Sequence, residues 1–260
     1  MNRIEQAKST MEKMNLTDSY LLPVFPEYVD IKNNFIYGEV FQKHELDSKT
    51  QLLVTIAALV TSESDDLEEI LHVALGKGLD PIELQEVFHQ AAPYVGFPKV
   101  EKGLKVLRDV FANAGLTLPL PKQCTVSEQD RLEKGISAQK MLFGEMIDAM
   151  RANAPENQKF MQDYLSAYCF GDTYTRAGLD LKTRELLTFV CIICLGGCDS
   201  QANSHAIANL FIGNGPEILY AAVAQSLPYI GFPKSLNAMS AINNAISTLE
   251  QMQQQNTNAK

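Results

Sequence analysis

The feature that most constrains this chain of 260 residues is an internal tandem repeat. The block GEVFQKHELDSKT at 38–50 aligns without gaps on GDTYTRAGLDLKT at 171–183, an offset of 133 (171 − 38). Further on, PYVGFPK at 93–99 aligns on PYIGFPK at 228–234, an offset of 135 (228 − 93). Two residues are gained between the blocks, most simply at the Gly196-Gly197 turn. Such self-similarity predicts two copies of one structural unit.

Each copy reads as helices joined by short turns, and strand signals are absent from both. The helices expected in the first copy are Thr50–Thr61, Asp66–Gly78, Pro81–Tyr94 and Pro98–Ala114. Those expected in the second are Pro155–Phe170, a connection through Gly171–Asp180, then Thr183–Leu195, a helix capped by Asp199 or Ser200 and ending near Gly213, Pro216–Gly231 and Pro233–Gln253. We therefore predict an all-α fold, with a first copy at 20–114, a linker at 115–140 that contains a polar helix from about Ser127 to Lys140, and a second copy at 141–253.

Composition excludes several classes of function. The formal net charge of −9 argues against nucleic-acid binding, which needs clustered Lys and Arg. The longest apolar run, 186–195, is shorter than the roughly 18 residues of a membrane span. The amino terminus is polar and lacks the apolar core of a signal peptide, so we expect a cytoplasmic protein. Five cysteines, odd in number and clustered, do not suggest an extracellular disulfide framework.

Most of the chemistry available near neutral pH lies between residues 184 and 205. Glu185 is expected in the first turn of one helix, and His205 in the second turn of the next. A carboxylate that orients an imidazole is a common general acid/base unit. The structural alternatives are an acid favoured by the helix dipole for Glu185 and a buried, hydrogen-bonded histidine for His205.

The cysteines of this stretch differ in their chemical prospects. Cys198 follows the two glycines and precedes a helix, a position that favours the thiolate, although it also suits an ordinary turn residue. Gln201 and His205 are four apart and share a helix face with it, which suits a reactive thiol or a polar pocket. Cys191 and Cys194 lie in an all-apolar helix without further zinc ligands at a suitable spacing, so we predict that both are buried.

The repeat supplies an internal comparison for the acid/base pair. Glu185 aligns with Leu52 at the first offset, and His205 aligns with Ile70 at the second. The first copy therefore has apolar residues at both positions. We predict one site of this kind per chain, in the second copy.

At this point the second copy resembles the carboxymuconolactone decarboxylase family, whose superfamily includes the alkylhydroperoxidase D-like proteins. The resemblance lies in GDxxxRxGL at 171–179, RELL at 184–187, His205, and QxxxYxGxP at 225–233. The first copy carries a part of the same pattern, namely Gly38-Glu39, Leu46, Gln90, Tyr94, Gly96 and Pro98. The resemblance implies an alkylhydroperoxidase D-like helical unit and a tight homo-oligomer, here a trimer of pseudo-dimers.

The two branches of the superfamily imply different chemistry. The decarboxylase branch acts on a lactone acid from aromatic degradation without a metal or organic cofactor. Glu185 and His205 would be its acid/base residues, and the candidate substrate-binding residues would be Arg176, as a carboxylate anchor, with Gln201 and Asp172. The peroxidase branch uses a Glu, a C-x-x-C pair and a His, which would require cysteines at 198 and 201. Position 201 is Gln, so the usual disulfide cycle lacks its second thiol.

Three hypotheses follow. The first is a cofactor-free, carboxy-lyase type of enzyme, in which Glu185 and His205 move protons on a small anionic lactone-type substrate. The second is a peroxiredoxin-like hydroperoxide reductase in which Cys198 is oxidised to a sulfenic acid and reduced by an external thiol. The third is a non-catalytic oligomeric binding protein.

Overall fold

The computed structural model describes residues 1–17 and 19–258, and within them the chain is built from helices with no strand. This confirms the all-α prediction and the tandem duplication of one helical unit. The elements are α1 (Arg3–Met14), α2 (Pro26–Gly38), η1 (Val40–Gln42), α3 (Ser48–Ser62), α4 (Leu67–Gly76), α5 (Pro81–Val95), α6 (Phe97–Asn113), α7 (Arg131–Phe143), α8 (Met146–Ala152), η2 (Glu156–Gln158), α9 (Lys159–Tyr164), η3 (Leu165–Tyr174), α10 (Leu181–Leu195), α11 (Asp199–Phe211) and α12 (Pro216–Asn258). Along this described part, no helix is both long and apolar enough to cross a bilayer.

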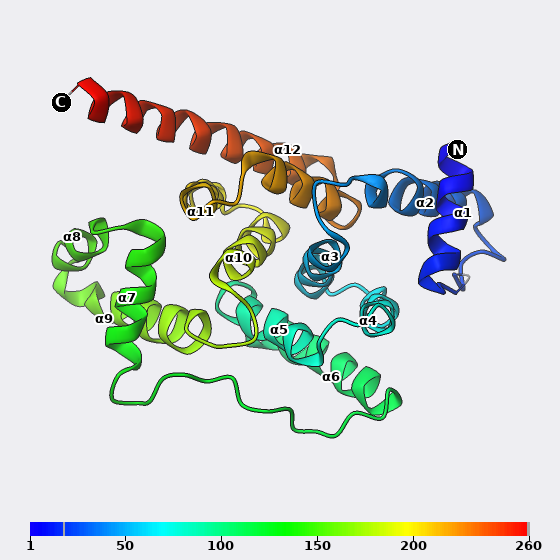
Figure 1. Ribbon diagram of the computed structural model, residues 1–260, viewed down its shortest axis with the longest axis horizontal. Coiled ribbons are helices and arrows are strands. Elements are labelled where there is room, and N and C mark those ends of the chain that lie inside the picture. The colour runs from blue at the N-terminus through cyan, green and yellow to red at the C-terminus, as the bar shows by residue number, and fades with distance from the viewer. Residues whose placement is uncertain (18, 259–260) are drawn as a thin grey trace.

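The two copies lie side by side, and a long connection below α6 joins them (Figure 1). Helix α10 begins and ends 133 positions after α3, and α12 begins 135 positions after α5. The long α12 is two helices divided at Gly231 (φ 74°, ψ 169°), which matches Gly96 (φ 83°, ψ 153°) between α5 and α6. The two extra residues fall within 196–201, where α11 begins one turn earlier than α4.

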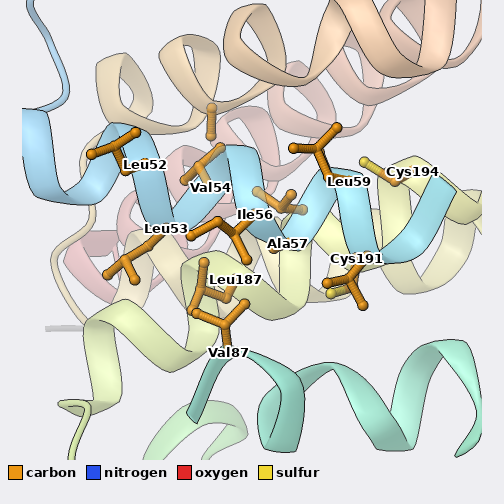
Figure 2. Close-up of a cluster of buried hydrophobic side chains, with 14 of the residues drawn as sticks. Leu52, Leu53, Val54, Ile56, Ala57, Leu59, Val87, Leu187, Cys191 and Cys194 are labelled. Carbon is orange, nitrogen blue, oxygen red and sulfur yellow. The ribbon is translucent and has the colours of Figure 1, made fainter. Parts of the chain in front are cut away.

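Helices α3 and α10 form the centre of the fold and are buried on nearly all sides. Figure 2 shows side chains of α3 packed with Leu187, Cys191 and Cys194 of α10 and with Val87 of α5. Each fully buried Leu or Ile contributes about 2 kcal/mol through the removal of apolar surface from water. Both cysteines are free and buried, as predicted, and burial raises the pKa of Cys191 to about 12.

The amino-terminal helix of each copy packs through a glycine. A Cβ on Gly38 would clash with the carbonyl oxygen of Arg3, and a Cβ on Gly171 with that of Arg131. Each arginine also pairs with the acid that follows the glycine: Arg3 with Glu39 at 2.8 Å, and Arg131 with Asp172. Helix α7 is thus the counterpart of α1, although most of it lies in the segment that we predicted to be a linker. The domain boundaries themselves stay a prediction.

The repeated Pro-Lys pair has a structural role. Lys99 Nζ donates to the carbonyl oxygen of Thr61 at 2.9 Å, and Lys234 Nζ donates to that of Cys194 at 2.6 Å. These carbonyls lie in the last turns of α3 and α10, where a cation is favoured by the helix dipole. One lysine per copy therefore closes the central helix of that copy.

The segment before α10 differs from our prediction. We expected a helix from Pro155 to Phe170 and then a connection from Gly171, whereas η3 continues as a π-helix to Tyr174. Its wider turn is accompanied by a hydrogen bond from the Thr175 hydroxyl to the carbonyl of Gly171, at 2.6 Å. The extra residues carry Tyr174 into the interior beside α10. A second difference is that Cys198, rather than Asp199 or Ser200, is the N-cap of α11, and its side chain makes no capping bond.

Candidate active site

Glu185 of α10 and His205 of α11 meet in the second copy. His205 Nδ1 lies 2.6 Å from Glu185 Oε1. Glu185 is 0% exposed and His205 is 8% exposed. The sequence allowed this pairing without proving it. Because Nδ1 faces the carboxylate, Nε2 is the nitrogen left for other partners, and it has none among the described residues. The ring therefore keeps one exchangeable nitrogen that the protein's own hydrogen bonds do not occupy.

The second oxygen of Glu185 is held by a chain of hydrogen bonds. Tyr174 Oη donates to Glu185 Oε2 at 2.6 Å and lies 2.7 Å from the hydroxyl of Thr188. Gln90 Nε2 donates to that hydroxyl at 3.0 Å, and Arg184 Nη1 donates to Gln90 Oε1 at 3.1 Å. Gln90 belongs to α5 of the first copy, so the site is assembled from both copies.

A buried ion cluster lies at the far end of this chain. Glu86 accepts hydrogen bonds from Arg176 at 2.8–3.1 Å and from Arg184 at 2.9 Å. Burial acts to raise the pKa of Glu86, but the bonds from the two guanidinium groups outweigh it and hold this pKa below its ordinary value. Arg176 is therefore already paired inside the protein. This geometry does not support the predicted role of Arg176 as a free anchor for a substrate carboxylate.

Aromatic rings form the walls around His205. The rings of Tyr94 and Phe143 meet the imidazole edge-on, at centroid distances of 5.6 and 5.5 Å. Tyr94 Oη lies 3.1 Å from Tyr174 Oη and accepts a hydrogen bond from Cys169 Sγ at 3.3 Å. Burial raises the pKa of Cys169 to about 12, so this group is a thiol donor. A substrate that reaches Nε2 therefore has apolar and phenolic neighbours.

One asparagine ties the two helices of the pair together. Asn209 Nδ2 donates to the carbonyl oxygens of Glu185, at 3.1 Å, and His205, at 2.8 Å. Asn214 in turn donates to Asn209 Oδ1 at 2.8 Å and to the carbonyl of Lys182 at 3.0 Å. These bonds fix the register of α10 against α11, and they hold the carboxylate and the imidazole at contact distance.

The other predicted site residues lie apart from this pair. Gln201 is exposed and accepts from the hydroxyl of Ser200, and Asp172 is engaged by Arg131. Cys198 is half-buried beside a cavity of about 140 Å³ that Lys234 also lines. It precedes His205 by seven residues, which is about 10 Å along a helix axis. The structure therefore brings Glu185 and His205 together, leaves Cys198, Gln201 and Asp172 outside their hydrogen-bond network, and places Arg176 at its far end, in the ion cluster.

Sequence reasoning missed the groups that support the pair. Tyr174, Thr188, Gln90 and Glu86 were not candidates, and their contacts cross from one copy to the other. The available signal was the spacing of Glu86 and Gln90, two polar residues four apart on α5, which share one face of that helix. A buried Arg184 directly before Glu185 was a second signal, since a buried charge requires a partner.

Comparison with known proteins agrees with this architecture. The family model of the carboxymuconolactone decarboxylase family matches residues 26–109 and again 161–244. The chain belongs to this family. Both matches include the central helix of a copy, and the second match contains Glu185, His205 and Tyr174.

Two curated relatives each match about one copy. A 4-carboxymuconolactone decarboxylase from Acinetobacter baylyi is 28% identical over 91 residues, 35% of this chain and 68% of that protein. An uncharacterized 15.0 kDa protein from Paracoccus denitrificans is 30% identical over 79 residues. That match covers 29% of this chain and spans only 59% of that relative's length.

Proposed function

We propose that this member of the carboxymuconolactone decarboxylase family is an enzyme that moves a proton through His205 Nε2 on a small anionic lactone-type substrate. The observation that carries the proposal is the buried contact of 2.6 Å between His205 Nδ1 and Glu185, which leaves Nε2 without a hydrogen-bond partner among the described residues. The carboxylate fixes the orientation of the ring, as in other acid/base pairs.

The chemistry suits the decarboxylation of a lactone acid whose carboxylate lies on a saturated ring carbon next to a double bond that is conjugated with the lactone carbonyl. The bond between the ring carbon and the carboxylate breaks, carbon dioxide leaves, and the electron pair moves toward the carbonyl as an enolate. The Nε2 proton of the His205 imidazolium then transfers to carbon. The neutral ring regains a proton from water, and Glu185 accepts the Nδ1 hydrogen bond throughout.

The relative from Acinetobacter baylyi supports the choice of substrate class, because its printed name gives 4-carboxymuconolactone as the compound that it decarboxylates. The aromatic walls of the site suit a small planar ring.

The thiol hypothesis has weaker support. A peroxidatic Cys198 would need an acid/base partner, and about two helical turns separate it from His205. Gln201, at the position of the second thiol, is exposed and bonded to Ser200. The observations in its favour are the position of Cys198 at the N-cap of α11 and the cavity that it shares with Lys234.

The test is turnover of 4-carboxymuconolactone, followed by release of carbon dioxide, in the full chain and in Glu185→Gln and His205→Gln. Both substitutions preserve shape, and we expect each to lower kcat by about 10²–10⁴-fold. His72→Gln, at an exposed histidine of the first copy, is the control and should retain full activity.

A parallel assay measures hydroperoxide consumption in wild type and Cys198→Ser. Selective, turnover-competent oxidation of Cys198, with no decarboxylation, would replace our proposal by the peroxidase. Decarboxylation that survives both Glu185→Gln and His205→Gln would remove the proposed roles. An absence of both activities would favour a non-catalytic binding protein.

A further inference from the structure

We propose that the first copy is a positioning unit for the acid/base pair of the second, and that Gln90 is the residue through which it acts. Gln90 joins the buried charge of Arg184 to the carboxylate of Glu185 through Thr188 and Tyr174. This inference rests on the proposed function and adds to it the residues that hold Glu185 as an oriented carboxylate.

The polarity of the chain begins at Arg184. A guanidinium group only donates hydrogen bonds, so the group of Gln90 that faces Arg184 must be its oxygen. The amide nitrogen of Gln90 then faces the Thr188 hydroxyl and donates to it. The orientation of this amide is therefore fixed by the charge of Arg184.

The polarity continues to the carboxylate. Tyr174 gives its single hydroxyl proton to Glu185, so its oxygen accepts from Thr188 and from Tyr94. Cys169 donates to the Tyr94 oxygen, which completes a second branch. Every donor thus points toward Glu185. Hydrogen bonds that are aligned in this way polarise one another and strengthen the last donation to the anion.

The charged groups around the pair agree with this direction. The cation Arg184 lies on α10, and the cation Arg176 lies just after η3. The anion Glu86, on α5, forms an ion pair with each of them. One positive charge of this cluster is therefore not balanced by Glu86. The other titratable groups that face the pair are Tyr94 on α5 and Cys169 and Tyr174 on η3, and burial raises the pKa of all three. Glu185 is the anion that the aligned chain joins to this surplus charge.

The first copy provides an internal control, because the centre of the chain recurs there without its ends. Gln225 Oε1 accepts from Gln51 Nε2 at 3.1 Å, and Gln225 Nε2 donates to Thr55 Oγ1 at 2.9 Å. Gln225 and Thr55 correspond to Gln90 and Thr188 by the repeat. Gln51 stands in place of Arg184, and Phe41 and Leu52 stand in place of Tyr174 and Glu185. The Gln–Thr bond is thus scaffold, and only the second copy connects it to a charge at either end.

The experiment compares Gln90→Met with Gln225→Met in the full chain. The Nδ1–H proton of His205 is followed by NMR at constant pH, with its signal assigned from His205→Gln. If the chain orients Glu185, Gln90→Met releases that carboxylate from its held position and weakens the hydrogen bond between Nδ1 and Glu185. The Nδ1–H resonance should then move upfield. Gln225→Met should leave this resonance unchanged, although both variants lose an equivalent pair of buried hydrogen bonds.

Turnover gives the second readout. We expect kcat of Gln90→Met to fall on the order of tenfold, below the 10²–10⁴-fold typical of losing the acid/base group itself, with little change in KM. Thr188→Val and Thr55→Val form a second matched pair, of nearly constant volume, in case the Gln90 variant does not fold.

The outcomes separate this inference from the proposed function. An unchanged Nδ1–H resonance of His205 in both Gln90→Met and Thr188→Val would overturn the positioning role, whatever the activity. Equal effects of the variants in the two copies would also overturn it, because they would indicate scaffold alone. A shifted resonance in a protein without lactone turnover would retain the positioning role and reject the proposed function.

Discussion

The two copies bury equivalent sites of opposite character. In the second copy the position between α10, α11 and α5 is filled by polar and charged side chains; in the first, the position between α3, α4 and the first half of α12 is largely apolar. The corresponding residues, second copy first, are Glu185 and Leu52, His205 and Ile70, Tyr174 and Phe41, Arg184 and Gln51, Glu86 and Ala221, Asn209 and Ala74. The helices match, so the frame does not dictate the chemistry.

This difference separates what folds the protein from what it does. Leu52 and Ile70 are 4% and 1% exposed and belong to the apolar core. Apolar side chains fill these positions without the desolvation cost of buried charges. Buried ion pairs generally add little stability over apolar residues of similar size, because desolvation opposes their attraction. The polar set in the second copy is therefore better explained by chemistry than by folding.

The comparison also explains why the copies are joined in one chain. The site in the second copy includes Gln90, Glu86 and Tyr94 from α5 of the first copy. In the reverse direction, Gln225 of α12 in the second copy makes the equivalent hydrogen bond to Thr55 of α3 in the first. Each site is thus built across the pair. A single copy could not complete it without a neighbour. The predicted trimer of such pairs stays a prediction.

The largest effect should come from making the second site resemble the first. The triple variant Glu185→Leu, His205→Ile and Tyr174→Phe places in the second copy the residues that the first copy already buries. We expect decarboxylation to fall by at least about 10²–10⁴-fold, the contribution of a general acid/base group. Activity and thermal unfolding are measured together.

The control is the fold itself. Helical content and a cooperative unfolding transition should be retained, because the frame accepts these side chains at the equivalent positions. A variant that keeps its activity would contradict the assignment of the site. One that does not fold would show that the two frames are less alike than their helices suggest.

The next effect is on stability, at the ion cluster that the first copy lacks. Glu86→Ala introduces the residue found at Ala221 and leaves two buried guanidinium groups without their carboxylate. Removing one partner of a buried pair costs about 3–5 kcal/mol. Chemical denaturation of this variant and of Glu86→Gln measures the loss.

The pH dependence of the same variants gives the sign of the interaction. The pKa of Glu86 is lower in the folded protein than its ordinary value of 4.5. Its ionised form therefore adds stability above about pH 4.5, and this stability is lost as pH falls through the folded pKa. The difference in unfolding free energy between wild type and Glu86→Gln should shrink in acid. A difference that is constant from pH 7 to pH 3 would contradict the ionised pairing.

The helices and their order could be predicted from the sequence because their signals are local. Helix boundaries are marked by proline at the start of α5 and α12 and by glycine at 96, 196 and 231. These residues end or begin a helix whatever the long-range contacts are. The repeat then transferred each boundary from one copy to the other. The burial of Cys191 and Cys194 could also be predicted, because their neighbours make the helix apolar on all sides.

The supporting network could not be predicted because its bonds are not local. Gln90 and Thr188 are 98 positions apart in the sequence, and Arg176 and Glu86 are 90 positions apart. A sequence shows Arg176 as a free cation, whereas the fold supplies its partner. The π-helical turn that carries Tyr174 inward has no dependable signal either, since the wider turn is set by packing against α7.

The smallest effect concerns the two glycines at the end of α10, where the copies also differ. Gly196 and Gly197 have φ of 73° and 70°, which disfavours alanine at both, and the ψ of 161° at Gly196 lies in a region that only glycine adopts readily. A Cβ on Gly196 would also lie 2.8 Å from Lys234 Cε, whereas one on Gly197 meets nothing within 4 Å. Gly196→Ala should therefore displace Lys234 from the carbonyl of Cys194, which adds about 1 kcal/mol, the value of one hydrogen bond, to the cost of the backbone strain.

A double-mutant cycle isolates this term. In a Lys234→Met background the cost of Gly196→Ala should fall by about 1 kcal/mol, because the displaced bond is already absent, whereas the cost of Gly197→Ala should stay the same. In the first copy Lys99 makes the equivalent bond to Thr61 and also pairs with Glu63 at 3.3 Å, so its contribution should weaken with salt. Lys234 has no such ion pair among the described residues. An unchanged cost of Gly196→Ala in the Lys234→Met background would mean that the lysine side chain moves aside while keeping its bond.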